Sequence, residues 1–171
     1  MSPNAGEAPA LAGYLRHPPC GAITGIGSLP MTDAAAAVEF VREFSPQIPF
    51  WPQLPQLSER ERVIGQGLGA VRDLIEPRRG AYGYRVKPGL LDEVLERFWH
   101  GSGALAASHA TGFYTFERCA SGGWFPQAVA VKGQIEGPIT LASYLFDGSR
   151  PFASDPVLFD AVTAHVSRLV R

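Results

Sequence analysis

The stretch GIGSLP at residues 25–30 has residue types suited to ligand binding; it lies between the apolar segment CGAIT and the alanine-rich run MTDAAAAVEF. Two glycines and a serine leave the backbone uncovered, so that a ligand can approach its N–H and C=O groups. The same residues also suit a simple turn between a strand and a helix. Both interpretations place Gly27 and Ser28 at the end of a strand-like segment.

A second such junction, GPIT at residues 137–140, follows QAVAVKGQIE, the clearest strand pattern in the chain. Ala128 to Val131 form a continuous apolar run, which is typical of a strand covered on both faces of a parallel sheet. Helix initiation at Pro138 is a sufficient structural reason for this junction. Contact of Gly137, Pro138 and Thr140 with a ligand is the alternative.

The histidines and cysteines show no spacing typical of metal ligands. They are His17, His100, His109, His165, Cys20 and Cys119. His109 has the chemistry of a base near neutral pH, although a hydrogen-bonded structural histidine is the favoured interpretation. The sequence therefore identifies no catalytic residue and predicts no metal site within this chain.

GQGLGA at residues 65–70 matches the glycine pattern of dinucleotide-binding loops. That fingerprint requires a strand before the first glycine, and LSERERVI is a poor strand. A flexible helix end is the favoured interpretation.

The elements that must position these residues alternate between strands and helices. A strand is expected at 20–28, and another at 48–51 that Pro49, Pro52 and Pro55 break into extended loop. A hairpin is expected within 76–86, and a strand at 128–131. Helical patterns cover residues 33–44 with Thr32 as N-cap, a glycine-weakened helix after Ser58, and residues 88–99, 139–146 and 155–170. Such alternation predicts an α/β fold with a parallel sheet.

Composition indicates one folded domain, because 46% of the 171 residues are hydrophobic and 18% are charged. The net charge of −1 does not favour nucleic acid or an anionic membrane as a partner. Residues 1–19 show no signal-peptide pattern, and we expect them to be a flexible tail. No stretch approaches the roughly 18 apolar residues of a membrane span, so a cytoplasmic location is expected.

ITGIGSLPMTD and VKGQIEGPITLASY together resemble two motifs of the cobalamin-independent methionine synthases, where the sequence runs like I-G-S-F-P-Q-T and K-G-x-x-T-G-P-V-T. The resemblance extends to the superfamily that these enzymes share with uroporphyrinogen decarboxylase, and above all to its methionine-synthase-like branch. It covers residues 20–171 and implies a TIM-type (β/α)₈ barrel. A complete barrel has about 250 residues, so this chain would be a partial barrel with the first three or four βα units and helical insertions.

The resemblance implies methyl transfer to a thiol such as homocysteine from a folate-type donor. Ile26, Gly27 and Ser28 would bind the substrate by matching the first motif, and Gln53 or Gln56 would stand where the synthases hold the substrate amine with a glutamate. On the donor side, Gly137, Pro138 and Thr140 would shape the cofactor-binding wall. Tyr144 would stack on the donor ring, where the synthases have tryptophan.

The zinc of the synthases is implied only for a complete family member, because its ligands lie on later strands than this chain carries. We therefore expect a domain at 20–171 that is truncated at its C-terminus, and self-association or a complementing chain to cover its open edge. Two alternatives stay open: a decarboxylase of the uroporphyrinogen type, and a non-catalytic half barrel that needs a partner.

Overall fold

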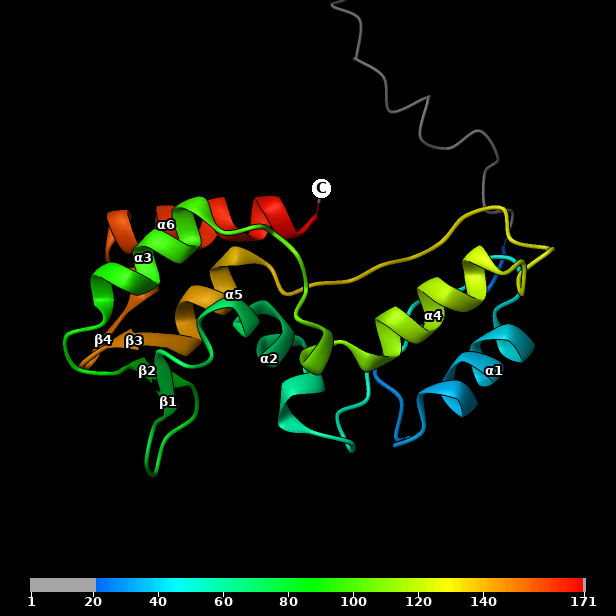
Figure 1. Cartoon of the computed structure of the whole chain (residues 1–171), viewed down its shortest axis with the longest axis horizontal. Helices are drawn as coiled ribbons and strands as arrows, with labels where there is room; N and C mark the ends of the chain where they lie inside the picture. Colours follow the sequence, from blue (N-terminus) through cyan, green and yellow to red (C-terminus); the bar gives the residue numbers. More distant parts are fainter. Residues whose placement is uncertain (1–20, 171) are drawn as a thin grey trace, which may run out of the picture.

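The computed structural model describes residues 21–170. It is a mixed α/β structure in which two groups of helices lie at opposite ends of an elongated molecule (Figure 1). One end carries α1 (Ala34–Phe44) and α4 (Thr111–Ser121). The other end carries α3 (Leu91–His100), α5 (Pro138–Tyr144) and α6 (Pro156–Leu169), with a small sheet beside them.

That sheet has four strands in the order β1-β2-β3-β4. β1 (Ile75–Pro77) and β2 (Tyr84–Val86) form the antiparallel hairpin that the sequence predicts. β3 (Leu145–Asp147) pairs in parallel with β2, and β4 (Arg150–Pro151) closes the other edge. The sequence predicted a helix through 139–146; instead the helix ends at Tyr144, and Leu145 is fully buried as the first residue of β3.

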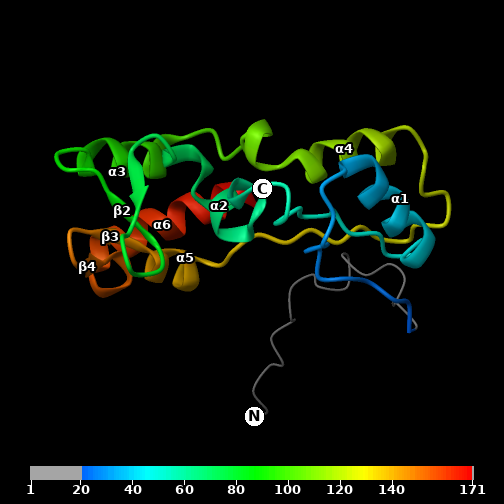
Figure 2. The ribbon, with the colours of Figure 1, turned by 90° about the horizontal axis from the view of Figure 1, so that it is seen from below.

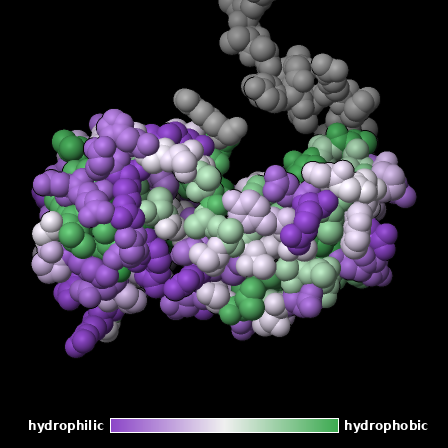
Figure 3. Space-filling view, viewed as in Figure 1, coloured by the Kyte–Doolittle hydropathy of each residue, from purple (hydrophilic) through white to green (hydrophobic). Residues whose placement is uncertain are grey.

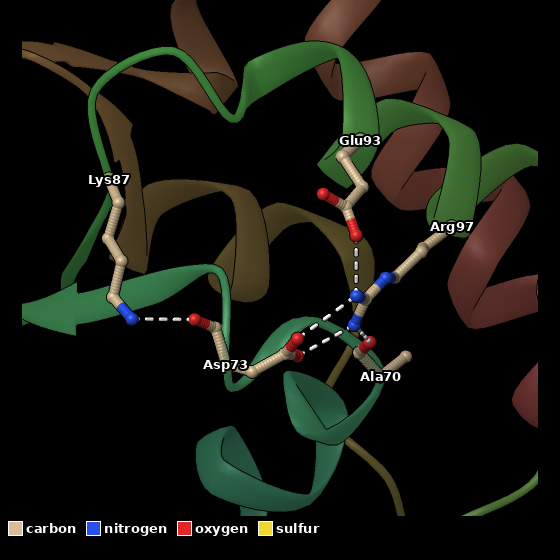
Figure 4. Close-up of polar contacts among 5 residues, drawn as sticks. All are labelled: Ala70, Asp73, Lys87, Glu93 and Arg97. Carbon is tan, nitrogen blue, oxygen red and sulfur yellow. Dashed lines mark hydrogen bonds and ion pairs between the residues drawn. The ribbon is translucent and has the colours of Figure 1, made fainter.

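The hairpin is tied to α3 by a charged network around Arg97 (Figure 4). The Arg97 guanidinium donates to both carboxylate oxygens of Asp73 at 2.6 and 3.0 Å, to Glu93, and to the backbone oxygen of Ala70. Lys87 donates to the backbone oxygen of Asp73. Hydrogen bonding from Arg97 lowers the pKa of Asp73, which keeps this carboxylate charged.

The helix boundaries follow their capping residues. Asp33, not the predicted Thr32, caps α1 by accepting from the backbone N–H of Ala36 at 2.9 Å. Asp155 caps α6 through the N–H groups of Val157 and Leu158. Each cap contributes about 1 kcal/mol.

The segment after Ser58 is less helical than its capping pattern suggests. Ser58 caps a 3₁₀ turn at Glu59–Glu61, and the helix α2 (Val63–Gly67) has only five residues. Glycines at 65 and 67 account for its shortness, because glycine lowers helix stability. Three further 3₁₀ turns lie at Gly69–Val71, Ala107–His109 and Phe152–Ser154.

Two separate cores hold the molecule together. The larger joins α3, α5 and α6 to the sheet around Phe98, Phe152 and Leu141, which are fully buried. The smaller joins α1 and α4 around Val38, Val41, Phe50 and Phe116. The chain between α4 and α5 crosses from one end to the other as a long extended run (Figure 2). Hydrophilic residues gather more densely over the end with the sheet (Figure 3).

Candidate functional site

Three extended segments lie side by side next to α1 and α4, at the positions where the sequence predicted strands of a parallel sheet. Residues 47–53 form the middle segment. Single parallel bridges join it to residues 27–29 through Ser28 and Gln53, and to residues 129–132 through Phe50 and Lys132. The parallel direction of the bridges agrees with the predicted parallel sheet, but none of the three segments is a continuous strand.

Backbone hydrogen bonds hold the three segments together. Gln53 donates to the oxygen of Gly27 at 2.8 Å, and its own oxygen accepts from Leu29 at 3.0 Å. On the other side, Lys132 donates to the oxygen of Pro49 at 2.8 Å, and its oxygen accepts from Trp51. The prolines of the middle segment lack an N–H, which interrupts a regular ladder as expected.

Gly27 lies against another part of the chain. Its φ is +114°, and a Cβ built on it would lie 1.4 Å from Nε2 of Gln134. Gln134 is fixed there, because its Oε1 accepts from Nζ of Lys132 at 2.8 Å and its Nε2 donates to the backbone oxygen of Trp51. Close packing and a positive φ therefore explain the glycine. They also place the first motif within contact of the second.

Ile26 and Ser28 remain accessible. The Ile26 side chain is 82% exposed, and Ser28 is exposed as well. The neighbours of Ser28 make the bonds to Gln53, so its own N–H and C=O face away from the middle segment. Neither group has a hydrogen-bond partner among residues 21–170. They are available to a ligand at this edge.

Gln53 is not accessible. It is 2% exposed, and its Nε2 donates to Oε1 of Gln66, which is equally buried, at 2.6 Å. Glu61, 1% exposed, lies nearby and accepts from the backbone N–H of Thr111. Gln53 is thus part of a buried polar cluster, whereas Gln56 is exposed on a turn.

The second motif divides into exposed and half-buried residues. Gly137 and Thr140 are exposed, and Pro138 is half-buried at the first position of α5. Nothing lies within 4 Å of a Cβ built on Gly137. Open space at Gly137 leaves room for a ligand but does not identify one.

Tyr144 lines a hollow of about 270 Å³ together with two further tyrosines, Tyr82 and Tyr84 of the hairpin. The rings of Tyr82 and Tyr144 lie 5.1 Å apart at an interplanar angle of 53°. Glu59 and Arg62 supply charge of both signs at the same hollow. The arrangement offers aromatic faces and a guanidinium to one ligand.

The hairpin approaches Tyr144 closely because of Gly83. Its φ is +91°, and a Cβ on it would lie 2.6 Å from the backbone oxygen of Tyr144. The Arg72 guanidinium carbon lies over the ring of Tyr84, 4.9 Å from the ring centroid. No motif in the sequence connects Tyr82 and Tyr84 to Tyr144; the one signal for their position is the alternation Tyr-Gly-Tyr within the predicted hairpin.

Two histidines lie in buried positions away from this hollow. His165 is 2% exposed, stacks on Phe98 and makes a hydrogen bond from Nε2 to the oxygen of Gly67 at 2.8 Å. Burial lowers the pKa of His165 and that of His109. The positive charges of nearby Arg60 and Arg72 lower the pKa of His109 by a smaller amount. Nδ1 of His109 makes a hydrogen bond with Oγ of Ser108.

Residues 21–170 contain no group of three or more His, Cys, Asp or Glu side chains arranged to hold a metal ion. The described residues therefore do not fit the zinc that the family resemblance implies. Over the same range, no helix is both long enough and apolar enough to cross a bilayer.

Comparison of the chain with family models, with curated proteins and with solved structures finds no match. The class that the fold itself defines is a mixed α/β protein with a small open sheet.

Proposed function

We propose that this chain forms part of a methyltransferase of the methionine-synthase-like type, which moves a methyl group from a folate-type donor to a thiol. The observation that carries the proposal is the position of Tyr144. The resemblance of the second motif assigns this residue to the donor ring. In the structure Tyr144 lines a hollow together with two more tyrosines and an arginine.

The donor side of the site is the tyrosine hollow. A pterin is flat and aromatic, so the faces of Tyr82, Tyr84 and Tyr144 can pack against it. The pterin ring carries a carbonyl oxygen, to which the Arg62 guanidinium at the same hollow can donate a hydrogen bond. The hollow has a volume of about 270 Å³, which suits the pterin ring and not the entire donor.

The substrate side is the edge formed by Ile26 and Ser28. Its unpartnered backbone N–H and C=O groups can pair with the carboxylate and ammonium of an amino-acid thiol. Gln53 has no place in this proposal, because its amide is held by Gln66 inside the protein. The substrate amine needs another partner, and Gln56 is the exposed amide in this region.

The reaction forms a bond between the thiol sulfur and the methyl carbon as the bond from that carbon to the donor nitrogen breaks. The proton of the thiol goes to the donor nitrogen. In this proposal the residues of this chain bind the two reactants, and the transfer also needs the reactants held side by side, as any bimolecular step does.

Calorimetric titration with 5-methyltetrahydrofolate tests the donor site. Replacing Tyr144 with leucine removes the aromatic face and should weaken binding about three- to tenfold, whereas Tyr144→Phe should bind like the wild type. Tyr114→Phe is the control, because Tyr114 does not line the hollow. Its hydroxyl donates instead to the backbone oxygen of Leu105. Undetectable binding, or equal affinities of Tyr144→Leu and wild type, would contradict the proposal.

A non-catalytic half barrel that needs a partner is a second candidate, favoured by one observation. Val129 and Val131 lie two residues apart on an outer segment of the parallel group and are 53% and 58% exposed. Alternate residues of an extended segment share a face, so these two side chains form an uncovered apolar strip. The uroporphyrinogen-type alternative rests on the resemblance alone, because no contact among residues 21–170 favours it over the other two.

A further inference from the structure

A hollow of about 340 Å³ lies at the other end of the molecule, between the last turns of α1 and the loop that follows α4. We call it the Trp124 hollow. Its lining residues are Glu39, Arg42, Glu43, Pro46, Trp124, Phe125, Pro126 and Gln127. None of them belongs to the site proposed above.

The loop after α4 holds the aromatic floor of this hollow in place. The backbone N–H of Trp124 donates to the oxygen of Cys119 at 3.1 Å, and Gly123 turns the chain with a φ of +80°. Phe125 packs on Phe116 of the smaller core, with ring centroids 5.2 Å apart. Trp124 nevertheless remains 44% exposed. The backbone at Trp124 is therefore held in place, while the indole remains accessible to solvent.

The charges around the floor favour a cation. Glu39 and Glu43 stand one helical turn apart on α1, against the single guanidinium of Arg42. Glu39 pairs with Arg42, whereas Glu43 makes no ion pair with any residue from 21 to 170. One carboxylate is thus left to neutralise a positive ligand.

The hollow already holds one cation over its aromatic floor. The Arg42 guanidinium carbon lies 5.6 Å from the centroid of the Trp124 ring, within the range of a cation–π contact. The ring is therefore oriented for a positive group. Arg42 is half exposed, and Glu39 is its one ion-pair partner within residues 21–170, so the guanidinium can move away from the ring.

We propose that the Trp124 hollow binds a small quaternary ammonium ion. Methyl groups on the nitrogen would pack on Trp124 and Phe125, the two prolines would enclose them, and the charge would pair with Glu43. A simple metal cation would gain nothing from this apolar floor, and an anion would be repelled by the carboxylate of Glu43, which has no ion-pair partner among the described residues. The proposal is independent of the methyltransferase proposal, because the two sites share no residue.

Calorimetric titration with choline chloride tests the charge requirement, with 3,3-dimethylbutan-1-ol as the uncharged molecule of the same shape. Ionic strength is kept constant with sodium chloride. Choline should bind at least about threefold more tightly than the alcohol. Equal affinities, or no detectable binding of choline at tens of millimolar, would overturn the proposal.

Three variants locate the binding. Glu43→Gln should weaken choline binding about threefold or more. Arg42→Gln should strengthen it, since the competing guanidinium is gone. Glu96→Gln, on an exposed glutamate of α3, is the matched control and should leave affinity unchanged. All three positions are exposed, so the fold is retained. Weaker choline binding by Arg42→Gln, or equal effects of Glu43→Gln and Glu96→Gln, would also overturn the proposal.

Discussion

The side-chain amide of Gln53 donates to the side-chain oxygen of Gln66 at 2.6 Å, and both residues are 2% exposed. This bond joins the end of the middle extended segment to α2. It removes from solvent the glutamine that the sequence assigned to the substrate. Gln53 thus contributes to the stability of the fold.

Replacing Gln53 with leucine should lower the free energy of unfolding by about 1–3 kcal/mol, because the buried oxygen of Gln66 loses its donor. Urea unfolding followed by circular dichroism measures the change. Gln56→Leu is the matched control: Gln56 is exposed, and its replacement should change stability by less than about 0.5 kcal/mol. Equal effects at the two positions would show that the Gln53–Gln66 bond has no such role.

Gly27→Ala should destabilise the protein by about 1–3 kcal/mol, since alanine at φ +114° is strained and its Cβ would overlap Gln134. Combining it with Gln134→Ala should recover the steric part only. Gly137→Ser serves for comparison, because that position is open and serine is a good N-cap for α5. A Gly27→Ala protein as stable as the wild type would contradict the packing described here.

Stability should fall as the pH drops below about 6.5, because His165 is held neutral in the folded protein. Its folded pKa is lowered by burial, so the unfolded chain takes up the proton first and acid favours unfolding. The stabilisation is complete above the pKa of the unfolded chain. It is lost as the pH falls toward the folded pKa.

Thermal unfolding between pH 5 and 8 measures this dependence. His165→Gln should flatten the curve, while His100→Gln should keep the wild-type slope because His100 is exposed. His109, whose pKa is also lowered, contributes in the same direction. A wild-type stability that is constant from pH 8 to pH 5 would be inconsistent with a buried neutral His165.

Replacing Val129 and Val131 with lysine should reduce self-association, because charge on an exposed apolar edge opposes pairing with another chain. Sedimentation velocity over a range of concentrations provides the measurement. The unfolding free energy should change little, since both side chains are more than half exposed. A wild-type chain that stays monomeric at every concentration would argue against the partner-seeking half barrel.

Local signals in the sequence predicted several elements correctly. The apolar periodicity of residues 33–44 and 155–170 matches α1 and α6, and the turn-rich stretch within 76–86 forms the hairpin. The proline-broken segment after Ile48 is extended without being a regular strand. These features depend on capping, periodicity and missing N–H groups, which are properties of neighbouring residues.

The candidate site was less predictable. Tyr144 was singled out by its motif, but Tyr82 reaches it only because β2 pairs with β3 across some sixty residues of chain. Gln53 and Gln56 could not be separated by sequence, since both are amides in the same proline-rich stretch. Burial separates them, and burial depends on where α2 packs.

By itself the sequence determined the apolar periodicity of α1, α3 and α6, where prolines interrupt extended segments, and which two junctions carry bare backbone. The tertiary structure alone decided that Gln134 occupies the space beside Gly27, that Gln53 is buried, and that three tyrosines share one hollow. The physical reason is the distance along the chain over which each effect acts. Caps and periodicity act within about one helical turn, whereas close packing and burial depend on residues that are distant in the chain.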